Sequence, residues 1–185
     1  PWPALAAALP PMVQRVGIDQ RPLDPTNRDD ARWLTACVWP EQPVRLERLR
    51  AALELTAADP PTLVRGDMVD EVGRLLDRVP DNCHAVVLSS WALAYVARDG
   101  RAHLLDLLRD AAGRLRERGG RLTLLTLEAD HLLPWVAAPE LPPDAPAEIR
   151  HASLLSVTSF DDRGVQAIPL ARCQAHLAWM DRLPG

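Results

Sequence analysis

The chain has 185 residues, of which 48% are hydrophobic and 25% charged, and its formal net charge is −4. This apolar content excludes an intrinsically disordered chain, and the length suits a single domain that spans residues 1–185. All 21 basic residues are arginine, which excludes chemistry that needs a lysine, such as a Schiff base or a P-loop. The acidic balance, with a pI near 5.7, argues against nucleic acid as a partner.

Three cysteines, Cys37, Cys83 and Cys173, lie far apart, are odd in number and show no CxxC spacing. This pattern is typical of reduced thiols in a cytoplasmic protein rather than of a disulfide framework or a zinc site. No apolar run approaches the length that spans a membrane, and the N-terminus has no basic leader of a signal peptide. We therefore expect a cytoplasmic protein without a membrane partner, and its opening at Pro1-Trp2-Pro3 suggests a piece of a longer chain.

Apolar periodicity and turn residues predict two strands and three helices in the first eighty residues. Thr26, with Asp29 three residues later, resembles a capping box that opens the first helix. Trp39-Pro40 ends that helix, and Asp59-Pro60-Pro61 ends the next one. The expected elements are a strand at Val13–Asp19, helices around Ala31–Val38 and Leu46–Leu53, a strand at Thr62–Arg65 and a helix at Val69–Val79.

The remaining residues predict two further strands, a long helix and a hairpin. His84–Ser90 is a mostly apolar stretch suited to burial on both faces of a sheet, and the helix after it closes on Gly119-Gly120, a glycine C-cap. Arg121–Glu128 is the next strand, and a proline-rich connection follows it. The turn Asp161–Gly164 then joins two antiparallel strands. These strands are expected at Ser153–Phe160 and Val165–Leu170.

Strand–helix alternation followed by a hairpin predicts an α/β fold, with a mostly parallel sheet and antiparallel strands added at one edge. In such sheets, ligands bind at the carboxyl ends of the parallel strands. The candidate site residues are therefore those that follow the predicted strands: Asp19, Asp67, Ser89–Trp91 and Glu128–His131.

Two aspartates follow successive strands. A carboxylate in the position of Asp19 can accept hydrogen bonds from the two hydroxyls of a ribose. Asp67 has the same place on the next strand, after a glycine that lets the backbone approach a ligand. The alternative is that Asp19 belongs to a turn and that Asp67 caps the helix beginning at Met68. Either aspartate alone is a weak signal, and the pair is more informative.

Ser89, Ser90 and Trp91, with Tyr95 nearby, could place hydroxyls and aromatic faces around a flat ligand, and we count both serines among the candidate cofactor contacts. The alternative is that these residues only pack a helix against the sheet. Neither serine has the flanking glycines of a nucleophile elbow, so the sequence does not support a hydrolytic triad.

Glu128, Asp130 and His131 form the most metal-like cluster of the sequence. No second histidine follows at i+4, and the other histidines are scattered. A solvated loop or a capped helix start explains the cluster better than a metal does, so we expect no metal site.

Three segments are similar to a known family: GIDQRPLDPTNRDDARWLTACVWPEQPVRLERLRAAL, PPTLVRGDMVDEV and HAVVLSSWALAYV. They resemble the uncharacterised bacterial family called domain of unknown function 2332, which is common in actinobacteria. The likeness runs from about Val16 to the region of Trp179, and the words Trp39-Pro40-Glu41-Gln42 and Arg65-Gly66-Asp67 are specific to it.

This family resembles the class I methyltransferase fold, so the resemblance implies a Rossmann-like sheet. In that comparison, the four predicted parallel strands match the second to the fifth methyltransferase strands, and the hairpin Ser153–Leu170 matches the last two. The resemblance places Asp19 at the ribose of S-adenosylmethionine and Asp67-Met68 at its adenine.

The first strand of methyltransferases, with its glycine-rich loop against the methionine part of the cofactor, has no counterpart in this chain. No GxGxxG-like segment follows a strand anywhere in the sequence. That segment would lie upstream of Pro1, so we expect either the C-terminal part of a longer protein or a chain that has lost the cofactor site. The fourth methyltransferase strand also lacks its Asn/Asp-Pro-Pro-Tyr motif here, so no substrate class is implied.

The leading hypothesis is a methyltransferase-like fragment whose full-length parent binds S-adenosylmethionine, while this chain alone shows no measurable affinity for it. Tyr95 and His131 are the candidates for a base. The alternatives are a non-catalytic binding or assembly module of the same fold and a metal-dependent hydrolase built on Glu128–His131. We expect an unidentified small molecule as ligand and self-association through an exposed sheet edge.

Overall fold

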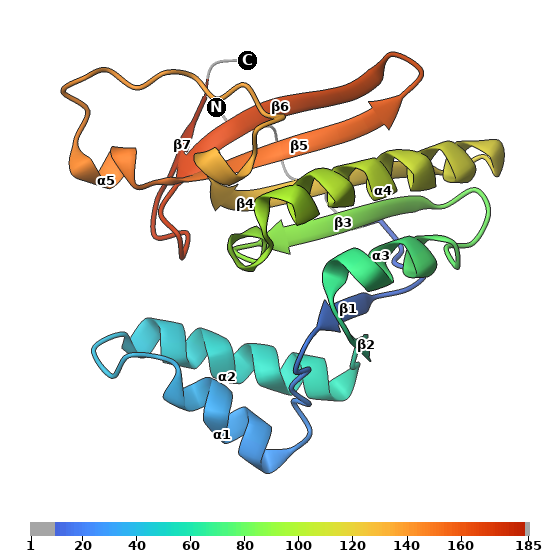
Figure 1. Cartoon of the computed structure of the whole chain (residues 1–185). Coiled ribbons are helices and arrows are strands. Elements are labelled where there is room, and N and C mark those ends of the chain that lie inside the picture. The colour runs from blue at the N-terminus through green and yellow to red at the C-terminus, as the bar shows by residue number, and fades with distance from the viewer. Residues whose placement is uncertain (1–9, 184–185) are drawn as a thin grey trace. The chain divides into compact units, whose positions relative to one another are not determined.

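The computed structural model describes residues 10–183, which form two compact units (Figure 1). The N-terminal unit comprises residues 10–71 and the C-terminal unit residues 72–183, with the division inside helix α3 (Met68–Leu76). Each unit has its own sheet. The expectation of a single domain stays a prediction.

The N-terminal unit is a two-stranded parallel sheet whose strands are joined by two helices. Its elements are β1 (Val16–Asp19), α1 (Arg28–Ala36), α2 (Pro43–Ala58) and β2 (Thr62–Arg65). Val16 lies opposite Thr62, and the pairing continues to Asp19 and Arg65. The two predicted helix stops, Trp39-Pro40 and Asp59-Pro60-Pro61, both lie just beyond the observed ends of α1 and α2.

Local features define where the two helices of this unit begin. The N-cap of α1 is Asn27, whose side chain accepts from the backbone N–H groups of Asp29 and Asp30. The predicted cap, Thr26, instead donates its hydroxyl to Asp24 Oδ1 at 2.7 Å. Pro43 begins α2, a position in which its missing N–H costs nothing. These helices therefore begin where short-range chemistry dictates.

The C-terminal unit is a five-stranded mixed sheet in the order β3-β4-β5-β6-β7. The pair β3 and β4 is parallel, and the other three pairings are antiparallel. A long helix, α4, packs on β4 and β5 (Figure 1). The elements are β3 (His84–Ser90), η1 (Leu93–Tyr95), α4 (Arg98–Glu117), β4 (Arg121–Ala129), η2 (Asp130–Leu132), α5 (Ala147–Arg150), β5 (Ser153–Asp161), β6 (Gly164–Cys173) and β7 (Met180–Arg182).

The core of this unit lies between α4 and one face of the sheet. The apolar stripe of α4 includes Leu108 and Leu115, which are at most 1% exposed, and Leu122, Leu124 and Leu154 are buried on the sheet. Alternation along β4 places one set of side chains on this face and the other set on the opposite face. The expected glycine C-cap is present as a Schellman motif, since the N–H of Gly120 bonds to the carbonyl of Leu115 at 2.8 Å.

The prediction of an α/β fold with an antiparallel hairpin is confirmed, but the mostly parallel sheet is wrong. The five-stranded sheet has one parallel and three antiparallel pairings, and the second parallel pair, β1 and β2, forms a separate sheet. A parallel return needs a crossover connection, usually a helix of a dozen residues or more. After β4 the chain forms only η2 and the four-residue α5, and it returns antiparallel as β5. The tail then contributes three strands, because β7 follows the predicted hairpin.

Candidate functional site

The carboxyl ends of β1 and β2 lie side by side in the N-terminal unit. Their parallel pairing sets Asp19 opposite Arg65 at the last position of each strand. Just beyond, Gln20 donates from Nε2 to Asp67 Oδ2 at 3.2 Å. The structure thus brings Asp67 to the end of β1, next to Asp19. Gln20 is the residue that sequence reasoning missed here, and its place directly after a strand-end aspartate was the available signal.

Both aspartates also accept local backbone hydrogen bonds. Asp19 Oδ1 accepts from the N–H of Arg21 at 2.7 Å, which is a turn interaction. Asp67 Oδ1 accepts from the N–H of Val69 at 2.8 Å and so caps α3, whose first residue is the half-buried Met68. Asp19 therefore belongs to a turn and Asp67 caps a helix, as the alternative interpretation of the two aspartates predicted. The turn bond of Asp19 uses Oδ1, and Oδ2 takes no part in it.

A buried carboxylate lies at the carboxyl ends of β3 and β4 in the C-terminal unit. Glu128 is 0% exposed, and its Oε1 accepts three hydrogen bonds. The donors are Ser89 Oγ at 2.7 Å and the backbone N–H groups of Ala92 and Leu93 at 3.0 and 3.1 Å. Glu128 Oε2 is buried without a hydrogen-bond partner in the described part of the chain. Glu128 therefore ties the loop after β3 to the end of β4.

The loop that Glu128 holds presents two aromatic side chains. Trp91 has a backbone φ of +55°, in the left-handed region, and its N–H donates to the carbonyl of Leu127 at 3.1 Å. Its side chain is 38% exposed, and Tyr95 in η1 is 90% exposed. Ser90, the last residue of β3, is also exposed. Of the candidates in and after β3, Ser89 is therefore hydrogen-bonded to Glu128, whereas Ser90, Trp91 and Tyr95 are exposed to solvent.

The side chains of Glu128, Asp130 and His131, the metal-like cluster of the sequence, do not converge on one point. Glu128 points into the protein, while Asp130 Oδ1 accepts from the N–H of His131 at 2.8 Å and its Oδ2 lies 3.5 Å from Arg172 Nη1. No group of three potential metal-ligating His, Cys, Asp or Glu side chains gathers within residues 10–183. Arg172, which is 4% exposed and also donates to the carbonyl of Pro139 at 2.9 Å, was missed from the sequence. The only indication in the sequence was its position between Ala171 and Cys173, two small apolar residues near the end of a predicted strand region.

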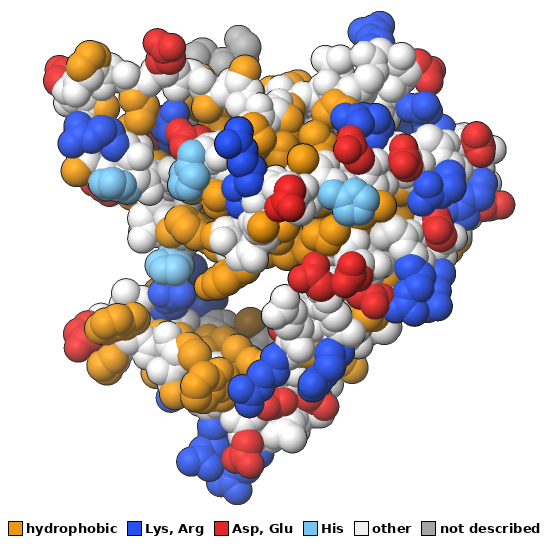
Figure 2. Space-filling model, viewed as in Figure 1, with side chains coloured by type: hydrophobic (Ala, Val, Ile, Leu, Met, Phe, Trp, Pro, Cys, Tyr) orange, Lys and Arg blue, Asp and Glu red, His pale blue; other side chains and the backbone are white. Residues whose placement is uncertain are grey.

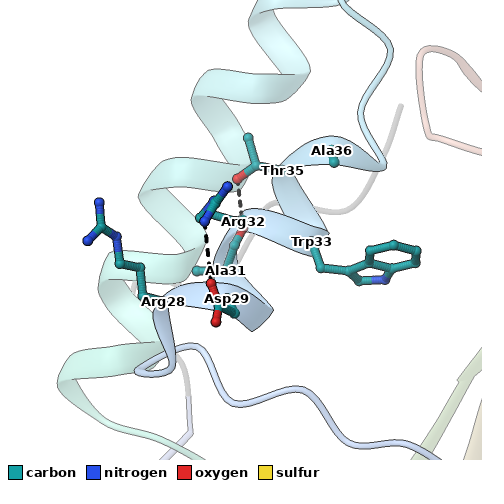
Figure 3. A pocket seen from close by; sticks show the side chains of 7 residues that line it. All are labelled: Arg28, Asp29, Ala31, Arg32, Trp33, Thr35 and Ala36. Carbon is teal, nitrogen blue, oxygen red and sulfur yellow. Dashed lines mark hydrogen bonds and ion pairs between the residues drawn. The ribbon is translucent and has the colours of Figure 1, made fainter.

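An open hollow of about 750 Å³ lies along α1. All seven residues that line it belong to this one helix: Arg28, Asp29, Ala31, Arg32, Trp33, Thr35 and Ala36 (Figure 3). The indole of Trp33 points away from the charged side chains of Arg28, Asp29 and Arg32, so the polar and aromatic groups do not converge (Figure 3). Ligand sites need convergent polar groups, and we do not assign one here.

None of the helices between residues 10 and 183 is long and apolar enough to cross a membrane. No curated protein and no solved structure matches the chain. A family model does match, over residues 1–182, and it describes uncharacterised proteins conserved in bacteria, DUF2332. Because this match covers almost its whole length, the chain belongs to the DUF2332 family, whose members are conserved in bacteria.

Proposed function

We propose that the full-length parent of this chain binds S-adenosylmethionine at the carboxyl ends of β1 and β2, as part of a methyltransferase-like domain. One observation carries the proposal: Asp19 and Asp67 follow adjacent parallel strands, and the hydrogen bond from Gln20 to Asp67 joins these two ends at 3.2 Å. Ligands of parallel α/β sheets bind at this edge, and a carboxylate there accepts the ribose hydroxyls of a nucleoside-type cofactor.

The resemblance to methyltransferases supplies the roles of the site residues in this proposal. Asp19 Oδ2 accepts from a ribose hydroxyl, while Asp67 and Met68 lie against the adenine. When bound, the cofactor supplies an electrophilic methyl group. The methyl group passes to a nucleophile that is held in line with the carbon–sulfur bond.

A non-catalytic binding module is the second candidate, and specific contacts favour it. Asp19 and Asp67 already satisfy backbone N–H groups of Arg21 and Val69. Ser89 is occupied by Glu128, and the sequence contains no glycine-rich loop after a strand. Carboxylates that already accept hydrogen bonds from nearby backbone N–H groups stabilise the fold whether or not a ligand is present, so these residues do not require a cofactor.

Calorimetry with S-adenosylmethionine decides between the two candidates. We expect no measurable binding by the 185-residue chain, because the contacts to the methionine part of the cofactor are absent from it. The polypeptide encoded by the whole gene is expected to bind. In that polypeptide, Asp19→Ala should weaken binding by about 10- to 100-fold, the value of one charge-assisted hydrogen bond.

Asp29→Ala is the matched control, because Asp29 is an exposed aspartate on α1 that makes only a surface ion pair with Arg32. It should leave the affinity unchanged. Tight binding by the 185-residue chain alone, or an Asp19→Ala variant with full affinity, would show that the site is placed wrongly. A whole-gene product that does not bind the cofactor supports the module instead.

A further inference from the structure

A pocket opens at the amino ends of β3 and β4, where these strands meet the end of α4 and the hairpin of β5 and β6 (Figure 1). The register of β4 with β5 ends at Thr123 and Ser159, although β4 begins at Arg121 and β5 continues to Asp161. Residues from this last pair and from the stretches beyond it line the pocket. Its volume is about 390 Å³, which is within the range of pockets that hold small molecules.

Three side chains that can donate hydrogen bonds to an anion line this pocket. His84 and Arg121 are the first residues of β3 and β4, and they lie opposite each other in the parallel register. Arg116 comes from the last turn of α4. The ring nitrogen Nε2 of His84 lies 2.8 Å from Thr123 Oγ1, so the imidazole is fixed beside the pocket. Guanidinium groups are the donors that proteins most often use to bind carboxylate and phosphate groups.

Arg121 differs from the other arginines around the end of α4, because within residues 10–183 it makes no ion pair. The others are paired with acids: Arg114 with Asp77 at 2.8 Å, Arg116 with Asp162 at 3.3 Å and Arg118 with Asp81 at 3.3 Å. The ion pair of Arg116 is weak, since Asp162 is 94% exposed. The acid that lines the pocket is Asp161, whose Oδ1 accepts from the N–H of Arg163 at 2.8 Å in the hairpin turn. The chain therefore supplies no anion of its own to Arg121.

The rest of the pocket combines an apolar wall with hydroxyl groups. Leu122 and Phe160 are 2% and 6% exposed, so they belong to the core and line the pocket as well. Thr123 and Ser159 are cross-strand partners and bring two hydroxyls to it. An apolar wall with a few polar groups is the usual composition of a small-molecule site. This composition suits a ligand with an oxyanion at one end and an apolar part at the other.

We propose that this pocket binds a small organic anion, a carboxylate or a phosphate ester, that carries an apolar group. The oxyanion lies against Arg121 and Arg116, with His84 beside them, and the apolar group lies against Leu122 and Phe160. The pocket uses residues of the C-terminal unit alone. The inference is therefore independent of the proposed cofactor site, and its test can succeed or fail separately.

An NMR titration of the 185-residue chain with three probes tests the proposal: benzoate, phenyl phosphate and uncharged benzyl alcohol. We expect both anions to shift the backbone amide signals of residues 120–123 and 159–161, and benzyl alcohol to bind at least about 10-fold more weakly. The anion that binds more tightly identifies the preferred oxyanion, and either result supports the proposal. Equal affinity for all three probes, or no shift of these signals with either anion, would overturn it.

Two charge substitutions at the pocket give an independent readout. Arg121→Gln should weaken binding of the anions by at least about 5-fold. Asp161→Asn should strengthen it by about 2- to 5-fold, because it removes a negative charge and keeps the acceptor oxygen of the turn. A purely structural role of these side chains would not change the affinity in opposite directions.

Arg109→Gln is the matched control, because Arg109 is an exposed arginine of α4 that pairs with Asp106 and does not line the pocket. It should leave the affinity for both anions unchanged. Full affinity in the Arg121→Gln variant would overturn the proposal. An equal loss in the Arg109→Gln variant would also overturn it, since the overall charge of the protein would then explain the binding.

Discussion

Both units of the chain consist largely of helices and strands, but they differ in how many of their side chains are buried. No described residue between positions 10 and 71 is buried, whereas the C-terminal unit buries a continuous set of side chains between α4 and the sheet. In the N-terminal unit Trp33, Trp39 and Leu55 are 59%, 70% and 74% exposed. Figure 2 shows hydrophobic side chains at the surface in the region of α1 and α2.

This comparison separates what starts a helix from what stabilises it. The cap at Asn27 and the proline at position 43 define the starts of α1 and α2 without any help from packing. Short isolated helices are nevertheless marginal in water, and most of their stability in proteins comes from an apolar face that packs. The N-terminal unit therefore has well-defined elements with little burial to stabilise them, and the following experiments test that difference.

The largest contrast is expected between two leucine truncations. Leu108→Ala, at a side chain that is 0% exposed in α4, should lower the free energy of unfolding by about 2–5 kcal/mol, because it removes buried methyl groups and leaves a cavity. Leu55→Ala in α2, at a side chain that is 74% exposed, should change it by less than about 0.5 kcal/mol. Urea unfolding of both variants measures the difference, and similar losses would show that α2 is packed in solution.

Removal of the Glu128 side chain should have the next largest effect. Glu128→Ala leaves the hydroxyl of Ser89 and the N–H groups of Ala92 and Leu93 without their acceptor. We expect a loss of about 2–4 kcal/mol in the free energy of unfolding, since buried donors are left unsatisfied. Glu128→Gln keeps an acceptor oxygen and should lose less than half of that. Glu117→Ala, at an exposed position of α4, is the control and should be neutral.

The thiols give a third comparison between the units. Cys37, in the N-terminal unit, is exposed, whereas Cys173 on β6 is buried, and this burial raises the pKa of the Cys173 thiol. In a Cys83→Ser background, a thiol reagent should modify Cys173 at least about 100-fold more slowly than Cys37 at pH 8. Comparable rates for the two thiols would mean that the pairing of β6 with its neighbouring strands opens readily.

The same raised pKa has a consequence for stability. The folded state holds the Cys173 thiol in its neutral form, so its contribution is fully present below the pKa of the unfolded thiol. It is lost as the pH rises through the pKa of the folded thiol. A Cys173→Ala variant should therefore show a flatter fall in stability on the alkaline side than the unsubstituted chain.

The smallest effect concerns the turn before α1. The hydroxyl of Thr26, and then its N–H, donate to Asp24 and lower the pKa of that carboxyl. Thr26→Val removes the hydroxyl and should raise the pKa of Asp24, as followed by NMR during a pH titration. Any stability from this bond is present above the pKa of the unfolded carboxyl and disappears as the pH falls through the folded value. Thr56→Val in α2 is the control and should leave Asp24 unaffected.

Local patterns predicted most of the elements of this fold. The bounds of β2 and β3 agree with the expectation, and β4 extends it by one residue to Ala129. Apolar periodicity and turn residues are local properties of the sequence, and this is why they predict the bounds of individual strands. The direction of the tail strands depends instead on how the chain between β4 and β5 packs, and no local pattern encodes that. The short strand β7 was missed because three polar-rich residues carry no periodicity.

The candidate site was predicted less completely than the fold. Strand ends identified the positions of Asp19 and Asp67, because the carboxyl edge of a parallel pair follows from topology alone. The pairing of Ser89 with Glu128 joins residues 39 positions apart, and it emerges only from the strand register that sets Ser89 opposite Thr126. The assignment of S-adenosylmethionine as ligand stays a prediction for the binding experiments above.

The left-handed backbone of Trp91 has a practical consequence for substitutions at this position. A residue with a side chain costs about 1–2 kcal/mol in this conformation, and glycine adopts it freely. A Trp91→Gly exchange therefore relieves backbone strain while it removes a ring that is 38% exposed. The relief of strain offsets part of the stability that the packed portion of the indole contributes, so Trp91→Gly should lose less stability than Trp91→Ala, which keeps the strained backbone.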